Sequence, residues 1–137
     1  IMIPTLVIDS TNCLTDLCVI GAGFSTDKSP LNRNGHRHPY TPVYNLLMSK
    51  YRNSNVRFSE IGVAGGASVA MWNRYFENGT FYFFDRDQNF LDHASQIVPS
   101  NNNNFFIMIY PFFIENPFFK FFYWFLVFFI FIILVKR

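Results

Sequence analysis

The sequence has little cysteine and little net charge. Two cysteines in 137 residues, Cys13 and Cys18, provide no disulfide framework, and their spacing matches no zinc or redox motif. We therefore expect two reduced thiols in a core and a cytoplasmic protein. Eleven Lys and Arg against nine Asp and Glu leave a net charge of +2. So balanced a charge gives no indication of a nucleic-acid partner.

Phenylalanine, in contrast, is abundant and concentrated at one end. The chain has 19 Phe, and 12 of them follow residue 104. This change in composition predicts three parts. Residues 1–13 are an uncertain N-terminal extension, residues 14–100 form a mixed-composition α/β domain, and residues 101–137 form a Phe-rich, low-complexity hydrophobic tail.

Three origins of the tail stay open. A shifted reading frame near Asn101–Asn104 is favoured, because Phe, Ile, Asn, Lys and Tyr are the residues of A/T-rich codons. A membrane segment is the second, since residues 118–135 carry only one charge over a length just short of a bilayer core. It would anchor the protein to a membrane. A buried core element is the third.

Hydrophobic periodicity predicts a parallel α/β unit over residues 56–96. An alternating strand at 56–62 runs into glycines and a helix at 68–76. A continuous β-favouring run at 80–84 then predicts a strand buried on both faces. A helix at 88–96 follows, with Phe90, Leu91 and Ala94 facing inward. This order favours a parallel sheet with right-handed crossovers.

Two shorter helices and a loop are expected before this unit. The first helix would be capped within Ser10–Asn12, bury Leu14, Leu17 and Cys18, and end at Gly21 and Gly23. Residues 24–40 have little periodicity and predict a loop. A second helix would begin at Thr41-Pro42 and turn an apolar face inward. That face comprises Val43, Leu46 and Leu47.

An acid and a glycine turn mark the candidate site. Glu60 stands at the end of a predicted strand, and Gly62, Gly65 and Gly66 follow. Asp85 comes 19 residues after Gly66, at the tip of the next strand. In a parallel sheet these features meet beyond the strand ends, where a carboxylate can accept ribose hydroxyls. A nucleoside-containing ligand is therefore indicated.

Two alternatives stay open for the glycines. Residues 19–23 match the first half of a dinucleotide fingerprint, although residue 26 is Thr and the expected acid is missing. The glycine turn at 62–66 could also be structural only. His36 and His38 form an H-x-H pair, but without further ligands nearby a loop role is favoured over a metal site.

The segments Glu60–Val63, Gly66–Trp72 and Phe81–Asp87 resemble the first two motifs of class I S-adenosylmethionine-dependent methyltransferases. Together with Ser25–Lys28 and His38–Tyr44, they are similar to the macrocin and mycinamicin type of sugar O-methyltransferase. The resemblance covers about residues 14–98. It implies a Rossmann-like parallel sheet, S-adenosylmethionine as cofactor, and a sugar hydroxyl of a small molecule as methyl acceptor.

The resemblance also implies roles for nine residues. Glu60, Gly62 and Gly66 would line the methionine half of the cofactor, Ser68 would donate a hydrogen bond from a helix N-terminus, and Asp85 would hold the ribose. The N-terminal segment that closes over the cofactor would contribute four more: Thr26, Asp27, Lys28 and Tyr40.

The resemblance is incomplete in two ways. Ser25 and Ala64 stand where the family commonly has glycine. The further strands that carry the family's general base and divalent-metal ligands are not recognisable, so no catalytic or metal residue is assigned. We therefore expect a truncated N-terminal part of such an enzyme, inactive as written. The alternative from another class is a tail-anchored membrane protein with a small nucleotide-binding or non-catalytic α/β head.

Overall fold

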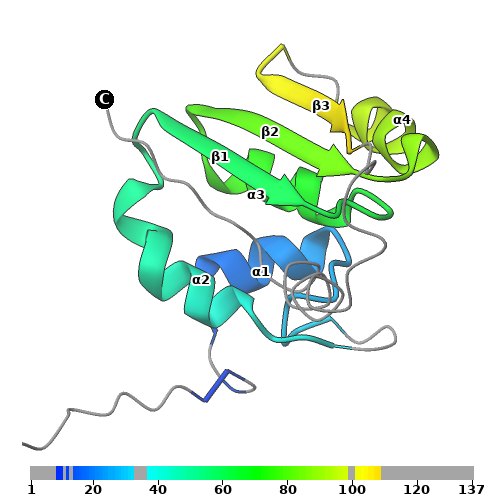
Figure 1. The fold of residues 1–137 in the computed structure, drawn as a ribbon. Helices are drawn as coiled ribbons and strands as arrows, with labels where there is room; N and C mark the ends of the chain where they lie inside the picture. Colours follow the sequence, from blue (N-terminus) through cyan, green and yellow to red (C-terminus); the bar gives the residue numbers. More distant parts are fainter. Residues whose placement is uncertain (1–8, 11, 13, 33–36, 99–100, 109–137) are drawn as a thin grey trace, which may run out of the picture.

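The computed structural model describes residues 9, 10, 12, 14–32, 37–98 and 101–108 (Figure 1). Within these residues there are four helices and three strands, and from residue 56 onward strands and helices alternate. In chain order they are α1 (Asp16–Gly23), α2 (Thr41–Met48), a 3-10 turn η1 (Ser49–Tyr51), β1 (Val56–Ile61), α3 (Ala67–Tyr75), β2 (Gly79–Asp85), α4 (Gln88–Ile97) and β3 (Asn103–Ile107).

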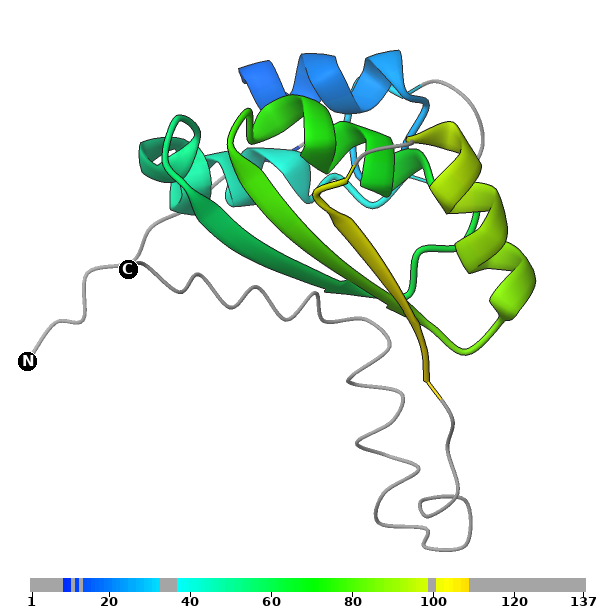
Figure 2. The same ribbon diagram turned by 90° about the horizontal axis from the view of Figure 1, so that it is seen from above.

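The three strands form a parallel sheet in the order β1-β2-β3. The register sets Glu60 opposite Phe83 and Asp85 opposite Ile107, so the two acids lie near the carboxyl edge of the sheet. Figure 2 shows α3 and α4, the two connections between strands, on the same face of the sheet. The predicted parallel α/β architecture is confirmed.

The strand β3 lies in the asparagine-rich segment, where the sequence analysis placed the start of the tail. Asparagine is depleted in strands, so the pattern did not indicate a strand that begins at Asn103. The side chains compensate: Asn104 Nδ2 donates to the carbonyl of Phe81 at 3.0 Å, and Phe105 stacks on Phe83 at 5.5 Å between ring centroids. The rest of the tail, including 118–135, lies outside the described residues.

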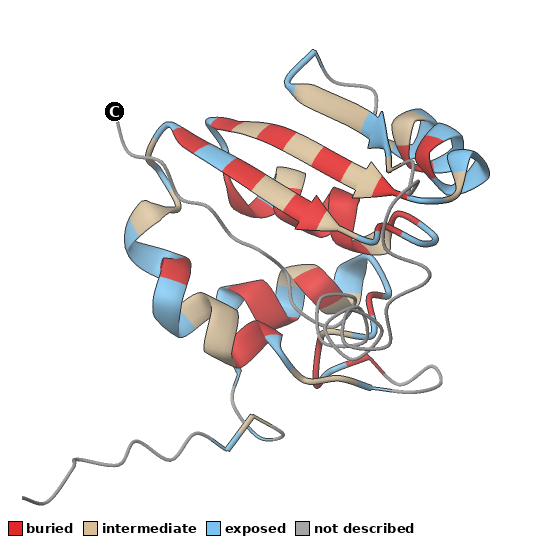
Figure 3. Cartoon of the chain, in the orientation of Figure 1, coloured by how far each residue is buried: buried red, intermediate tan, exposed pale blue. Residues whose placement is uncertain are grey.

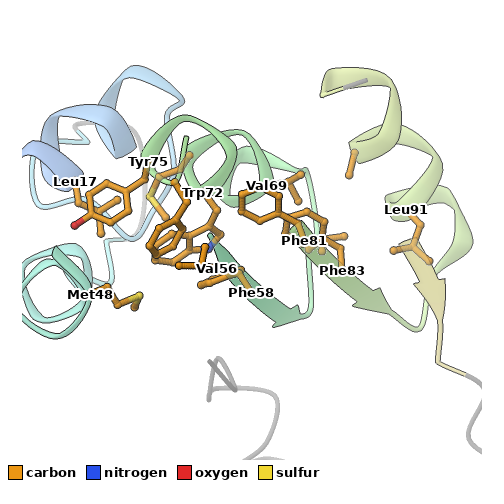
Figure 4. Packing of buried hydrophobic residues seen from close by; sticks show 14 residues of the cluster. Leu17, Met48, Val56, Phe58, Val69, Trp72, Tyr75, Phe81, Phe83 and Leu91 are labelled. Atoms are coloured by element: carbon orange, nitrogen blue, oxygen red, sulfur yellow. The ribbon is translucent and has the colours of Figure 1, made fainter. Parts of the chain in front are cut away.

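An aromatic core fills the space between the sheet and the helices (Figures 3 and 4). Phe58 of β1 is its centre, with ring centroids 4.6 Å from Trp72, 5.6 Å from Phe76 and 6.1 Å from Phe81. All four side chains are almost completely buried. Trp72 of α3 and Phe76, its C-cap residue, thus face the sheet.

The strand β2 is buried more completely on one face than on the other, which corrects the prediction of burial on both. Its burial alternates along the strand, with Phe81 and Phe83 buried and Tyr82 and Phe84 only half-buried. Phe106 of β3, 43% exposed, stacks on Phe84 at 5.1 Å. None of the described helices covers this aromatic face (Figure 2).

The first helix begins later than predicted. Its N-cap is Thr15, whose hydroxyl accepts a hydrogen bond from the Cys18 amide at 3.3 Å, and not a residue within Ser10–Asn12. Leu14 precedes the helix and is 70% exposed, contrary to the prediction. Gly21 lies inside α1 and does not end it. A Cβ there would lie only 3.1 Å from Thr26 Cγ2, so this close contact favours glycine.

Three other predicted core positions are also exposed. Leu46 and Leu47 of α2 are 54% and 57% exposed, because α2 packs on its neighbours through Thr41, Pro42 and Met48 instead. In α4, Phe90 is 42% exposed, whereas its predicted partners in the core, Leu91 and Ala94, are buried. Cys18 is a buried thiol as expected, and Cys13 lies outside the described residues.

The two faces of β2 predict different costs for neighbouring substitutions. Phe83→Ala should lower the free energy of unfolding by about 3–5 kcal/mol, because it opens a cavity in the aromatic core. Phe84→Ala, the matched control on the half-buried face, should cost only about 1 kcal/mol. Urea denaturation of both variants measures the difference. Equal costs would contradict the one-sided core.

Candidate active site

The turn after β1 uses three left-handed backbone conformations. They are Gly62 at φ 86°, Ala64 at φ 43° and Gly66 at φ 78°. Around Gly62 nothing lies within 4 Å of the place a Cβ would occupy, so a ligand can approach its backbone. Gly66 differs, because a Cβ there would lie 3.1 Å from Ile97 Cδ1 and 3.2 Å from Ala94 Cα. The structure thus gives Gly66 a packing role against α4.

Asp85 connects this turn to the end of β2. Its Oδ2 accepts hydrogen bonds from the amides of Val63 at 2.8 Å and Ala64 at 3.3 Å. Its Oδ1 accepts one from the amide of Asp87 at 3.0 Å, just before α4 begins. A carboxylate offers about four lone-pair sites, so one position on Oδ1 stays available to a ligand hydroxyl.

Two further amides of the turn are engaged within the protein. The Gly62 amide donates to the carbonyl of Phe84 at 2.7 Å, and the Gly66 amide donates to the carbonyl of Val63 at 2.9 Å. Four amides of the turn therefore have partners already. A glycine turn that binds phosphate directs such amides at the ligand. In this turn, four of the five amides from Gly62 to Gly66 donate to protein acceptors instead.

Glu60 is a buried acid without a hydrogen-bond donor of normal geometry. Its side chain is 1% exposed, and Lys28 Nζ lies 3.8 Å from its Oε1. Burial raises the pKa of the carboxyl, and Lys28 is the largest opposing influence. The Ser68 hydroxyl and the Trp72 indole also lower the pKa, while Asp27 raises it. Among the described residues, no hydrogen bond satisfies either Glu60 oxygen or Trp72 Nε1.

Lys28 reaches Glu60 from the N-terminal segment. The backbone holds this segment against α2: the His38 amide donates to the carbonyl of Asp27 at 2.8 Å, and the Thr41 amide donates to that of Lys28 at 3.0 Å. The Lys28 ammonium lies between Glu60 and Asp27, whose Oδ1 is 3.6 Å away. Of the four residues predicted here, Lys28 contacts the strand-end acid directly.

Three other predicted site residues lie near Lys28 in the sequence or next to Glu60 in the structure. Thr26 is buried, and its hydroxyl accepts a hydrogen bond from the Lys28 amide at 3.4 Å, which shapes the turn. Tyr40 is 36% exposed and stands 5.9 Å from the ring of Tyr44. Ser68 lies in the first turn of α3 and is buried next to Glu60.

Tyr44 is a site residue that the sequence analysis did not single out. Burial raises its pKa most, and the charge of Glu60 adds to the rise. Its ring lies 5.6 Å from that of Trp72 and joins α2 to α3. The sequence feature that could have identified Tyr44 is its position four residues after Tyr40, which puts both rings on one side of α2.

Three alternatives from the sequence can now be weighed. Residues 19–23 lie within α1 or at its end, not at the end of a strand, so the dinucleotide interpretation is wrong.

The described ranges contain no cluster of three His, Cys, Asp or Glu residues suited to a metal. His38 stacks on Tyr40, and His36 lies outside these ranges. No helix in the described part of the chain is long and apolar enough to cross a membrane.

Comparison with known proteins gives matches of one kind. The demethylmacrocin O-methyltransferase of Streptomyces fradiae is 32% identical over 88 residues, which is 59% of this chain and 21% of that protein. The mycinamicin VI 2''-O-methyltransferase of Micromonospora griseorubida is 40% identical over 58 residues, 37% of this chain and 14% of that protein. The resemblance predicted from the motifs is confirmed.

Two further matches are a third relative and a solved structure. The 8-demethyl-8-alpha-L-rhamnosyl tetracenomycin-C 2'-O-methyltransferase of Streptomyces olivaceus is 40% identical over 55 residues, 35% of this chain and 15% of that protein. The MycE methyltransferase in complex with Mg and SAH is 24% identical and covers 71% of this chain and 22% of its own, with a TM-score of 0.49. No family model matches the chain. The chain spans about a fifth or less of the length of these relatives.

The burial of Glu60 predicts a pH-dependent stability. Its raised pKa means that the folded protein holds this proton at pH values where the unfolded chain, with an ordinary value near 4.5, has lost it. Stability should therefore fall as the pH rises above about 4.5. Glu60→Gln removes this loss, so the variant should be more stable than the parent at neutral pH by on the order of 1 kcal/mol, the scale of an unsatisfied buried group.

Thermal and urea denaturation at a series of pH values between about 4 and about 8 measure the difference in stability between Glu60→Gln and the parent. It should shrink as the pH falls toward about 4.5. The matched control is Glu77→Gln, an exposed acid before β2, which should show no such trend. A Glu60→Gln variant less stable than the parent at neutral pH would mean that the pair with Lys28 outweighs the cost of burial.

Two strained residues predict gains in stability. Ser25 at φ 57° and Ala64 at φ 43° are the positive-φ residues other than glycine in the described part of the chain. Ser25→Gly and Ala64→Gly should each raise the free energy of unfolding by about 0.5–1 kcal/mol. Ala70→Gly, in the middle of α3, is the control and should lower it by about 1 kcal/mol. Losses at both turn positions in urea denaturation would refute the argument from strain.

Proposed function

We propose that this chain contributes the S-adenosylmethionine-binding part of an O-methyltransferase that acts on a hydroxyl of a sugar-containing small molecule. The observation that carries the proposal is Glu60, a buried acid beside a glycine turn that leaves the backbone of Gly62 accessible. The similarity to three O-methyltransferases whose names specify macrolide or glycosylated acceptors supports the choice of reaction.

Electrostatics favour this cofactor over a dinucleotide. A pyrophosphate needs amide donors, and the amides of Gly62, Val63, Ala64 and Gly66 are already engaged within the protein. The carboxylates of Asp85 and Glu60 would also repel it. A ligand with a positively charged sulfonium and ammonium meets the opposite conditions. The carboxylates that would repel a phosphate would attract such a ligand.

The residues present fit the cofactor. The two Glu60 oxygens without hydrogen-bond donors would hold its ammonium group, and the position left on Asp85 Oδ1 would accept a ribose hydroxyl. The open space at Gly62 would let its chain pass close to the backbone. When bound, the cofactor supplies an electrophilic methyl group. These residues orient it, and orientation is the larger part of such catalysis.

Gly66 has a different place in the proposal from the one first expected. We assign it to the contact between the turn and α4, because Ala94 and Ile97 fill the space beyond it. A larger residue there would displace α4 and so change the turn indirectly. Loss of binding in such a variant would accompany a loss of stability, which makes Gly66 a poor probe of the ligand.

Titration calorimetry on the 137-residue chain tests the proposal. S-adenosylhomocysteine should bind at least about tenfold more tightly than NAD, a difference of about 1.4 kcal/mol. Asp85→Asn should weaken S-adenosylhomocysteine and 5'-methylthioadenosine alike by about 1.5–3 kcal/mol, because both carry the ribose and hydrogen bonds to a charged acceptor are of this strength.

The matched control is Asp92→Asn, an exposed acid on α4 whose carboxylate accepts a hydrogen bond from Gln88. It should change neither affinity. Melting temperatures of all variants separate a lost contact from a lost fold, because Asp85 also holds three backbone amides. NAD binding as tightly as S-adenosylhomocysteine would refute the proposed function.

A further inference from the structure

The turn between α3 and β2 contains an Asn-Gly pair that the proposed function does not use. Glu77 and Asn78 form the turn, and β2 begins at Gly79. The Asn78 side chain is exposed. Several other asparagines are held in place, such as Asn73, whose Nδ2 donates to the carbonyl of Val69 at 3.0 Å. In the described part of the chain no such hydrogen bond holds the Asn78 side chain, so it can turn toward the next peptide bond.

Gly79 leaves its backbone nitrogen open to a reaction with that side chain. Glycine has no Cβ to crowd the nitrogen. The Gly79 amide donates to the carbonyl of Phe76 at 3.3 Å, longer than the usual distance of about 2.9–3.0 Å. This hydrogen bond is therefore weak. A side-chain amide without a partner thus adjoins a backbone nitrogen that is only weakly held.

The packing of the core requires glycine at this position. A Cβ on Gly79 would overlap the ring of Phe81. That ring is buried between Phe58 and Phe83, with centroid distances of 6.1 Å and 5.8 Å, so it cannot move aside without cost (Figure 4). The same aromatic core that stabilises the sheet therefore keeps a glycine directly after Asn78.

We propose that Asn78 is a site of spontaneous deamidation. The Gly79 nitrogen loses its proton to hydroxide and attacks Cγ of Asn78, which forms a succinimide ring and releases the side-chain nitrogen as ammonia. Water then opens the ring at either carbonyl. One opening yields aspartate, and the other yields isoaspartate, in which the main chain runs through Cβ and Cγ. Water is the only reactant consumed, and nothing is oxidised or reduced.

The isoaspartate product lengthens the main chain by one carbon at the start of β2. Gly79 is paired with Val56 of β1, and Phe81 enters the core two residues later. The extra carbon displaces the start of the strand relative to its partner, against a core that is closely packed. We therefore expect the isoaspartate form to be less stable than the parent. The aspartate form keeps the original backbone and should stay close to the parent in stability.

Asn55 is a matched control within the same chain. It is exposed, and it directly precedes β1 as Asn78 precedes β2. Its side chain also has no hydrogen bond to the residues that the structure describes. The residues that follow the two asparagines, Val56 and Gly79, are paired in the sheet. The branched valine side chain crowds the attacking nitrogen, so Asn55 should react much more slowly.

Peptide mapping by mass spectrometry tests the proposal on the full chain after incubation at neutral pH. Trypsin separates the two sites, because residues 53–57 and residues 75–86 each follow an arginine and end in one. Residues 75–86 should gain the mass of an exchange of NH2 for OH at least about tenfold faster than residues 53–57. Fragment ions assign the change to Asn78. The rate should rise in proportion to hydroxide concentration, because the attacking nitrogen must lose its proton.

Three comparisons control for the fold and for the chemistry. The chain unfolded in urea gives the intrinsic rate at Asn78, and the folded chain should react within about tenfold of it. Asn78→Gln should abolish the mass change in residues 75–86, because a longer side chain forms the ring far more slowly. Asn78→Asp should melt close to the parent, whereas the isoaspartate form, separated by chromatography, should melt at a lower temperature.

The outcomes are distinct. An intact Asn78 in the folded chain, beside conversion in the unfolded chain, would overturn the proposal, since the turn would then protect the site. Equal rates at Asn55 and Asn78 would also overturn it, because the glycine would then make no difference. The readout does not involve a cofactor, so either result leaves the proposed function untouched.

Discussion

The carboxylate of Asp85 holds together the three segments from which the site is built. It accepts hydrogen bonds from Val63 and Ala64 in the turn after β1 and from Asp87 before α4. The turn contains three residues in left-handed conformations, and bonds of this kind offset the strain of the non-glycine member, Ala64. With the turn fixed, α3 starts at Ala67 and places Ser68 and Trp72 beside Glu60.

The site accordingly concentrates negative charge where many nucleotide-binding turns present amide donors. Glu60 is buried with a single cationic neighbour at 3.8 Å, and Asp85 occupies amides that a phosphate would need. Burial of an acid without hydrogen bonds opposes folding. In the proposed function, the ammonium group of the ligand would supply the missing partner next to the open backbone of Gly62. Stability and binding compete at this one residue.

The regular part of the fold could be predicted from the sequence, and the contacts between distant residues could not. Strands and helices from Val56 to Ile97 follow from alternation, periodicity and glycine. The beginning of β3 at Asn103 was not predicted, because asparagine side chains support it by hydrogen bonds to the carbonyls of Phe81 and Val98, which no local pattern reveals. The site acids were identified, but the engagement of Asp85 with residues 21 and 22 positions earlier depends on the folded register.

The strand order β1-β2-β3 leaves one edge of β1 without a partner among the described residues. Right-handed crossovers place their helices on one face as long as strands are added in one direction, and on the other face once the direction reverses. A strand added beyond β1, from this chain or from another, would create such a reversal. The half-buried face with Tyr82 and Phe84 would then receive its covering layer. The topological switch point would lie at the carboxyl end of β1, beside Glu60 and Gly62, where open α/β sheets bind their ligands.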